Sequence, residues 1–251
     1  MNSLSVVIIT FNEEENLARC IDSVGELADE IVVVDSFSTD KTEAIANAKG
    51  ARFMQHKFEG HIEQKNFANE QARHDWVLSI DADEMLSDEL RQSIAAAKIN
   101  PDADGYTMNR LNFYCGQPVK TCGWYPDTKL RLWNRTKGHW TGMNPHDKFE
   151  LTKGSAIEHL VGDLHHNTYP THQSFLAQRE KFARISAMHM QNHSLFFLLI
   201  KMLLSAPFKF LRNYIFKQGF TDGSIGFTIC YHQSREVFLK YFYAVQLKSG
   251  K

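Results

Sequence analysis

The stretch SVVIITFNEEENLARCIDSVGELADEIVVVD, from Ser5 to Asp35, decides the fold. Its two short runs rich in β-branched residues, Ser5–Thr10 and Glu30–Val34, are typical of strands buried in a parallel sheet. Apolar residues recur between them at the spacing of a helix, at Leu17, Cys20, Ile21 and Val24. The stretch therefore predicts a strand–helix–strand unit. Asn12, with Glu15 three residues later, predicts a capping box where the helix begins.

The same alternation continues to Asp81. Arg52–Gln55 and Trp76–Ile80 are the next predicted strands, and Thr42–Lys49 and Ile62–Arg73 the next predicted helices. Alternating strands and helices at short intervals predict an α/β fold with a doubly wound, mostly parallel sheet.

Polar side chains follow three of these strands, where Asn12, Asp35 and Asp81 stand directly after the apolar runs. Ligands of open α/β sheets bind beyond the carboxyl ends of the strands. We therefore expect a binding site at this edge of the sheet.

The segment Asp81-Ala82-Asp83 places two carboxylates two residues apart just past a strand. Such a pair can share a divalent cation, Mg²⁺ or Mn²⁺, with a diphosphate, because both ions prefer carboxylate and phosphate oxygens. The cation would neutralise charge on a departing nucleotide. The alternative is a solvated acidic turn that caps a helix starting at Ser87.

Four segments carry a resemblance to a known family: VVIITFNEEENL (Val6–Leu17), VVVDSFSTDKT (Val32–Thr42), EQKNFA (Glu63–Ala68) and LSIDADE (Leu78–Glu84). They resemble the donor-binding half of the family-two inverting glycosyltransferases, which have a GT-A fold and use nucleotide-diphosphate sugars. Further motifs resemble a bacterial subgroup that builds the inner core of lipopolysaccharide and includes glucosyltransferases. These are NFYCGQPVK, GWYPDTKLRLWNR and PHD within Arg110–Asp147, and KQGFTDGSIGF at Lys217–Phe227.

The resemblance implies a set of site residues. The nucleotide sugar would be bound by Thr10, Asn12, Glu13, Asp35, Gln64, Asn66, Asp81 and Ala82. Asp83 would hold the metal, Asp147 would be the catalytic base, and Trp124, Tyr125 and Arg131 would contact the acceptor. For Asp35 the chemistry agrees independently, because a carboxylate accepts from the N–H of uracil. Its alternative is a turn residue that caps the next element.

Inversion requires a base that takes the proton of the attacking acceptor hydroxyl, and a carboxylate is the usual choice. Asp147 matches the family position, although the subgroup more often has Glu there. Alternatively, His146 and Asp147 form a structural hydrogen-bonded pair.

Six histidines lie between His139 and His172, and one stands in a distinctive pattern. The subgroup's G-D-L-x-H-x-T-Y pattern matches Gly162–Tyr169 and points to His166, which would complete the metal site or touch the diphosphate. Four aromatic residues of the presumed acceptor half can pack on the apolar faces of sugar rings. They are Trp124, Tyr125, Trp133 and Trp140, and core packing accounts for at least two of them.

The stretch Lys181–Thr221 has six basic residues and no Asp or Glu. Within it Leu195–Phe216 is strongly apolar, but its longest uninterrupted apolar run, Leu195–Ile200, is far short of the ~18–20 residues of a spanning helix. As a helix it carries a basic stripe (Lys201, Ser205, Lys209 and Arg212 within about 80°) that suits an anionic membrane surface. Pro207 is expected to kink or split it. The alternative is a helix packed on the catalytic core with a solvated basic edge.

We expect a catalytic domain over residues 1–168, with a nucleotide-sugar-binding half (1–100) and an acceptor half (101–168), and a helical region over 169–251. The formal net charge of −1 excludes a general electrostatic binder of nucleic acid. The N-terminus has no basic segment and no long apolar run of a signal peptide, so the expected location is cytoplasmic, at most peripheral on the inner membrane.

The predicted function is transfer of a hexose, glucose from UDP-glucose, with inversion to a lipid-linked saccharide of the lipopolysaccharide inner core. One alternative is a nucleotidyltransferase of similar fold, which would need a Gly-rich basic loop where Phe11-Asn12-Glu13-Glu14 stands. The other is an inactive carbohydrate-binding relative, against which the retained carboxylates argue.

Overall fold

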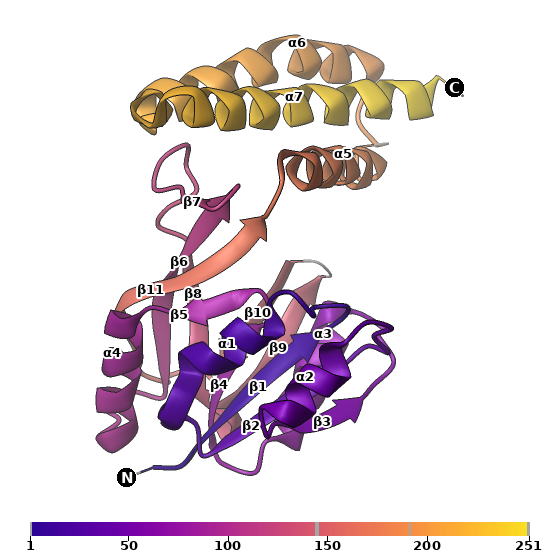
Figure 1. Cartoon of the computed structure of the whole chain (residues 1–251). Helices are drawn as coiled ribbons and strands as arrows, with labels where there is room; N and C mark the ends of the chain where they lie inside the picture. Colours follow the sequence, from indigo (N-terminus) through magenta and orange to yellow (C-terminus); the bar gives the residue numbers. More distant parts are fainter. Residues whose placement is uncertain (1, 144–145, 191, 250–251) are drawn as a thin grey trace. The chain divides into compact units, whose positions relative to one another are not determined.

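The computed structural model of the 251-residue chain describes residues 2–143, 146–190 and 192–249, and of His146 only the backbone. The chain forms two compact units (Figure 1). The first unit comprises Met1–Arg110 and Asp127–His166, and the second comprises Leu111–Pro126 and Asn167–Lys251.

Nine strands of the described chain form one mixed sheet in the order β3-β2-β1-β4-β8-β6-β11-β5, with β7 paired to β6. Its parallel part is β1 (Leu4–Thr10), β2 (Glu30–Asp35), β3 (Arg52–Gln55) and β4 (Trp76–Asp81). The rest is β5 (Glu84–Leu86), β6 (Gly105–Tyr114), β7 (Gln117–Pro118), β8 (Thr128–Asn134) and β11 (Ile157–Tyr169), and a separate hairpin is formed by β9 (Gly138–Met143) and β10 (His146–Leu151). The four strands predicted before residue 81 are therefore confirmed. Two later stretches whose sequence also predicts strands, Tyr106–Tyr114 and Thr128–Trp133, lie in β6 and β8.

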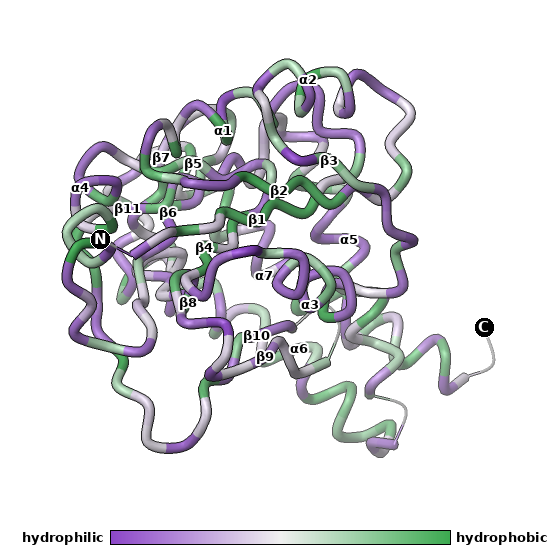
Figure 2. Tube along the Cα trace, turned by 90° about the horizontal axis from the view of Figure 1, so that it is seen from below, coloured by the Kyte–Doolittle hydropathy of each residue, from purple (hydrophilic) through white to green (hydrophobic). Residues whose placement is uncertain are grey.

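β1, β2 and β4 are buried on both faces, which explains their apolar runs, whereas the edge strand β3 is only partly buried. Val6, Val7, Val32 and Val33 are almost completely inaccessible, and Figure 2 shows hydrophobic stretches along β1 and β2. Four helices belong to this unit: α1 (Leu17–Val24), α2 (Thr42–Ala48), α3 (His61–Gln71) and α4 (Asp88–Ile99), with short 3₁₀ turns at Gly25–Leu27 and Arg135–Lys137.

The predicted capping box at Asn12 is wrong. α1 begins at Leu17, four residues later than a cap at Asn12 requires, and its N-cap Asn16 makes no capping side-chain hydrogen bond. Asn12 instead has a φ of 54°, and its side-chain oxygen accepts from the backbone N–H of Thr39 at 2.9 Å. Pairing with the loop after β2 has replaced the local cap.

The second unit is mainly helical, with α5 (His172–Met188), α6 (Leu195–Leu211) and α7 (Gly223–Lys248). A π-helical turn, η3 (Arg212–Phe216), and a 3₁₀ turn, η4 (Gly219–Asp222), join α6 to α7. Tyr114, Val119, Phe175 and Ile229 are part of its core.

A kink or split was predicted at Pro207. The split does not occur, since α6 continues through Pro207 to Leu211, and the kink stays a prediction. Packing against α7 supports the helix there, and the Ser234 hydroxyl of α7 donates to the carbonyl of Ala206 at 2.6 Å. Within the described ranges, no helix has both the length and the apolar character needed to cross a bilayer.

Candidate active site

The register of the parallel strands brings their polar ends together. Thr10, the last residue of β1, lies opposite Asp35, the last residue of β2. On the other side of β1, Ile9 lies opposite Asp81, where β4 ends. The expected meeting of side chains at the carboxyl edge of the sheet is thus present.

A buried charge network surrounds Asp81. The Arg131 guanidinium of β8 donates to Asp81 Oδ2 at 3.0 Å and to Glu84 Oε1 at 2.7 Å, and Glu84 is completely inaccessible. Burial alone would raise the pKa of Asp81, but the positive charges of Lys65 and Arg131 outweigh it and hold this pKa well below its ordinary value. Asp81 therefore stays ionised at neutral pH.

Lys65 of α3 connects Asp81 to the predicted base. Its Nζ lies 2.8 Å from Asp147 Oδ2 and 3.3 Å from Asp81 Oδ1, and 4.6 Å from the centre of the Trp140 ring. The lysine side chain is only 6% exposed and that of Asp147 14%. One buried ammonium therefore holds a strand-end carboxylate and Asp147 in the same site. The side chain of His146, which the alternative pairs with Asp147, lies outside the described part of the chain.

Asp83 and His166 lie side by side, with His166 Nε2 3.1 Å from Asp83 Oδ2. β5 and β11 bring them together, because His166 pairs in register with Glu84, the residue after Asp83. Burial raises the pKa of Glu13, and the nearby carboxylates of Asp83, Asp40 and Asp81 add to this effect. The neighbourhood of Asp83 is thus electronegative.

These side chains fit a divalent cation bound together with a diphosphate. In the described residues no group of three or more His, Cys, Asp or Glu could enclose an ion. Mg²⁺ and its analogues need no such group, since one or two carboxylates and the substrate phosphates suffice. Asp83 and His166 can supply an oxygen and a nitrogen ligand on the protein side.

The residues predicted to bind the nucleotide differ in how they are engaged. The Thr10 hydroxyl is buried and has no hydrogen-bond partner among the described residues, as expected of a group that awaits a ligand. Asp35 is buried and accepts hydrogen bonds from both the backbone N–H (2.7 Å) and the hydroxyl of Ser38. The turn contacts proposed as the alternative for Asp35 are therefore present, and its contact with a base stays a prediction.

Gln64 and Asn66 of α3 use their amides within the protein. Gln64 pairs with the His56 ring at 2.8 Å and donates to the Ser36 hydroxyl at 3.1 Å. The Asn66 amide donates to the backbone carbonyl of Trp140 at 3.0 Å and accepts from the backbone N–H of Trp140 at 2.9 Å. These bonds fix α3 against the loop after β2 and against β9. Direct contact of either residue with a nucleotide sugar stays a prediction, as it does for Ala82, which is buried between Asp81 and Asp83.

Core packing of two aromatic residues is confirmed. Trp133 and Trp140 are buried, and Trp133 stacks on Phe149 with ring centres 3.8 Å apart. Trp124 and Tyr125 belong to the second unit, where Trp124 packs on Tyr169 at 5.4 Å and Lys120 lies over the Tyr125 ring at 5.2 Å. Their contact with an acceptor stays a prediction.

Sequence reasoning missed the roles of Lys65 and Glu84 and gave Arg131 to the acceptor. Lys65 stands in the EQKNFA motif next to two residues that were assigned roles. Its position in a predicted helix among apolar and amide residues could have indicated a buried lysine paired with carboxylates. The Arg131 side chain is 4% exposed and bound to two carboxylates, so its direct contact with an acceptor stays a prediction.

Several glycosyltransferases are similar in sequence to this chain. It is 30% identical over 227 residues to the "Lipopolysaccharide core biosynthesis glycosyltransferase LpsC" of Rhizobium meliloti, covering 86% of this chain and 82% of that protein. It is 31% identical over 215 residues to an uncharacterized glycosyltransferase of Rickettsia typhi, RT0209, covering 73% and 71%. An uncharacterized glycosyltransferase of Rickettsia bellii is 45% identical over 108 residues, but the chain spans only 37% of its length.

Among solved structures, a complex of Mycobacterium tuberculosis glucosyl-3-phosphoglycerate synthase with Mn²⁺, UDP-glucose and phosphoglyceric acid is similar to 45% of this chain and 44% of its own. The identity is 27% and the TM-score 0.38, so the likeness is confined to part of the fold.

Residues 5–155 match the model of "Glycosyl transferase family 2". This range runs from β1 to β10 and includes Asp83 and the charge network of Lys65, Asp81, Arg131 and Asp147, but it ends before β11 and His166. The predicted GT-A fold is thereby confirmed. The chain belongs to glycosyl transferase family 2.

Proposed function

We propose that the chain transfers a hexose, glucose from UDP-glucose, with inversion to a saccharide of the lipopolysaccharide inner core. The observation that carries the proposal is the strand-end site, in which the buried Lys65 pairs with Asp81 and Asp147, and Asp83, two residues after Asp81, pairs with His166. The likeness to LpsC over most of both chains supports the acceptor class.

The nucleotide would bind along the carboxyl ends of β1, β2 and β4. Thr10 offers an unpaired hydroxyl, Asn12 and Glu13 line the loop after β1, and Asp35 would accept from the N–H of uracil. Asp81 would lie near the ribose, with Gln64, Asn66 and Ala82 completing the pocket. Arg131 would act indirectly, by holding Asp81 in place.

Asp83 and His166 would hold a Mg²⁺ or Mn²⁺ ion with the diphosphate. When bound, the ion supplies positive charge that stabilises the leaving nucleotide. A soft metal is disfavoured, since the protein ligands are one carboxylate and one imidazole.

Asp147 would serve as the base. The acceptor hydroxyl attacks the anomeric carbon from the face opposite the nucleotide, its proton passes to Asp147, and UDP leaves with the bonding electrons. Lys65, whose Nζ lies 2.8 Å from Asp147 Oδ2, would orient the Asp147 carboxylate between turnovers. Trp124 and Tyr125 would pack on the acceptor sugar.

A lipid-linked acceptor would require this reaction to take place at an anionic membrane surface. We propose a peripheral location on the cytoplasmic face of the inner membrane, where nucleotide sugars are available.

Incubation of the purified protein with UDP- and ADP-hexoses and truncated lipopolysaccharide tests the proposal. We expect transfer from UDP-glucose, a product of inverted anomeric configuration by NMR, and loss of activity in chelator that Mn²⁺ or Mg²⁺ restores. The Asp83→Ala variant should be inactive at every metal concentration. Release of hexose 1-phosphate in place of UDP would indicate a nucleotidyltransferase, and full activity in chelator would remove the metal from the mechanism.

A further inference from the structure

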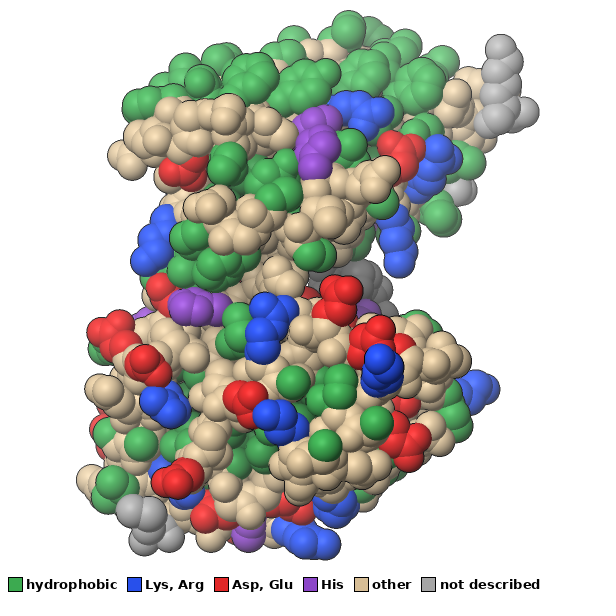
Figure 3. All heavy atoms as spheres, viewed as in Figure 1, with side chains coloured by type: hydrophobic (Ala, Val, Ile, Leu, Met, Phe, Trp, Pro, Cys, Tyr) green, Lys and Arg blue, Asp and Glu red, His purple; other side chains and the backbone are tan. Residues whose placement is uncertain are grey.

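The second unit exposes an unusual amount of apolar side chain. We define the α6–α7 face as the exposed apolar residues of α6, η3 and α7. Its most exposed members are 50–78% accessible: Phe196, Leu203, Leu204, Phe208, Leu211 and Phe216. Figure 3 shows hydrophobic side chains gathered over α6 and α7. A patch this concentrated marks an interaction surface, whereas single exposed apolar residues are ordinary.

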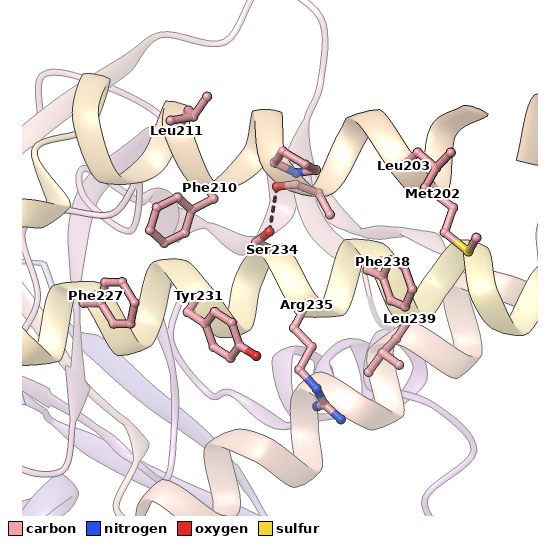
Figure 4. Close-up of a pocket in the computed structure, with 12 residues that line it drawn as sticks. Met202, Leu203, Phe210, Leu211, Phe227, Tyr231, Ser234, Arg235, Phe238 and Leu239 are labelled. Atoms are coloured by element: carbon pink, nitrogen blue, oxygen red, sulfur yellow. Dashed lines mark hydrogen bonds between the residues drawn. The ribbon is translucent and has the colours of Figure 1, made fainter. Parts of the chain in front are cut away.

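An apolar groove runs along this face between the two helices (Figure 4). Its volume is about 920 Å³, and its walls include Leu203 and Phe210 from α6 and Phe227 and Phe238 from α7. Arg235 is the charged residue of the lining. The interior of the groove is therefore apolar, which suits a lipid chain, while the Arg235 side chain extends from α7 away from α6 (Figure 4).

The charges around the α6–α7 face indicate which kind of partner it binds. From Leu195 to Lys248 there are seven Lys and Arg and only two acids, Asp222 and Glu236. Both acids have partners inside the unit: Asp222 accepts from the Thr121 hydroxyl, and Glu236 pairs with Arg179 at 2.9 Å. Two copies meeting through this face would bring positive charges together, which opposes association. An anionic lipid surface has the complementary charge.

The mode of contact follows from the helix itself. α6 has 17 residues, and Lys201 and Lys209 interrupt its apolar sequence. Such a helix lies in the plane of the interface with its apolar side among the acyl chains. Lys201 and Arg212 are exposed, whereas Lys209 is partly buried, and this burial lowers the pKa of Lys209. We therefore expect the apolar side chains to contribute more to membrane binding than the basic stripe (Lys201, Ser205, Lys209 and Arg212).

We infer that the α6–α7 face inserts into the acyl-chain region of an anionic lipid leaflet, with Lys201, Arg212 and Arg235 at the headgroups. This inference deepens the proposed membrane location and rests on it, but it does not depend on which sugar is transferred.

Vesicle binding tests the inference without donor or acceptor. The full chain should co-sediment with vesicles of phosphatidylglycerol and phosphatidylethanolamine. Leu203→Ser, Leu204→Ser and Phe208→Ser together should weaken this binding at least about a hundredfold, since three large side chains no longer leave water. The matched control carries Ile99→Ser, Ile157→Ser and Val161→Ser, which are comparably exposed in the first unit, and should bind like the wild type. Lys201→Glu with Arg212→Glu should weaken binding to anionic vesicles about ten- to a hundredfold.

A second measurement does not depend on loss of binding. Trp introduced by Phe208→Trp should be quenched by lipids brominated on their acyl chains, and Trp introduced by Ile99→Trp should not. Unchanged vesicle binding of the triple-serine variant, or unquenched Trp at position 208, would overturn the inference. A dimer in sedimentation that the triple-serine variant dissociates, without vesicle binding, would assign the face to a second copy. Transfer to a water-soluble acceptor fragment, measured separately, reports on the proposed reaction alone.

Discussion

In the first unit, charged side chains are buried and paired, whereas in the second unit large apolar side chains stand at the surface. Glu84 is completely inaccessible and Arg131 and Lys65 nearly so, and all three take part in ion pairs. In the second unit Phe196 and Phe216 are 74% and 78% exposed. Charged side chains are usually exposed and large apolar ones buried. The first unit departs from this rule in its charged residues and the second unit in its apolar residues.

Neither the buried charges nor the exposed apolar side chains are explained by the stability of the fold, which indicates that each unit has a partner. Burying an ion pair is often no better for stability than an apolar replacement, so the network around Asp81 is best explained by a charged ligand at the strand ends. Exposed apolar area contributes nothing to the stability of an isolated domain, so the α6–α7 face is best explained by a partner. Substitutions can distinguish residues that serve a ligand or partner from residues that stabilise the fold.

The largest effect is expected from Asp147→Asn. Removal of a general base should lower turnover by ~10²–10⁴ while leaving UDP affinity nearly intact. Initial rates with UDP-glucose and calorimetric titration of UDP give both quantities. Asp104→Asn is the matched control, since Asp104 also pairs with a lysine, Lys137, at 2.7 Å but lies outside the site. A collapse of UDP affinity would assign Asp147 to the donor site.

Arg131→Met should lower the free energy of unfolding by about 3 kcal/mol, because it removes the cation that bonds both Glu84 and Asp81 and leaves them only the longer contacts with Arg110 (3.5 Å) and Lys65 (3.3 Å). The pKa of Asp81 is lowered in the folded protein, so its stabilising pairing is present above the unfolded-state pKa of ~3.9 and is lost as pH falls below that value. The difference between variant and wild type should therefore shrink in acid. Urea titrations at pH 7 and at about pH 2.5 measure it, because the loss begins only below ~3.9.

Arg91→Met is the control for this prediction. Arg91 pairs with Asp88 at 2.9 Å, but both side chains are well exposed, so the expected loss is at most about 1 kcal/mol. Equal losses in the two variants would mean that burial of the Asp81 network has no special energetic consequence.

The parallel strands could be predicted from the sequence because burial on both faces leaves unbroken β-branched runs such as Val32–Val34. The pairing of Lys65 with Asp147 could not, because 82 residues separate them and only the packing of α3 beside the β9–β10 hairpin brings them together. The Asn12 cap failed for a related reason. A local pattern favoured the helix, but the loop after β2 offered Asn12 a stronger set of partners.

Ser234→Ala should lower the free energy of unfolding by about 1 kcal/mol, the usual contribution of one hydrogen bond. The Ser234 hydroxyl donates to the Ala206 carbonyl at 2.6 Å and joins α7 to α6 next to Pro207. Thr228→Ala is the control, because the Thr228 hydroxyl bonds within α7 to Ser224 and should matter less. If Ser234→Ala is neutral in thermal unfolding, packing alone keeps α6 continuous through Pro207.

The smallest effect on stability is expected from Leu204→Ser, which tests directly whether the apolar side chains of the second unit are exposed in the folded protein. Leu204 is 66% exposed, so the substitution removes few contacts and should change the free energy of unfolding by at most about 0.5 kcal/mol. Leu198→Ser in the same helix is the control. Leu198 is completely inaccessible and packs in a core with Tyr241 and Ala244 of α7, so its loss should cost about 2–5 kcal/mol. A large loss from Leu204→Ser in a vesicle-free buffer would show that the α6–α7 face is covered within the folded protein, and its apolar residues would then serve the fold rather than a membrane.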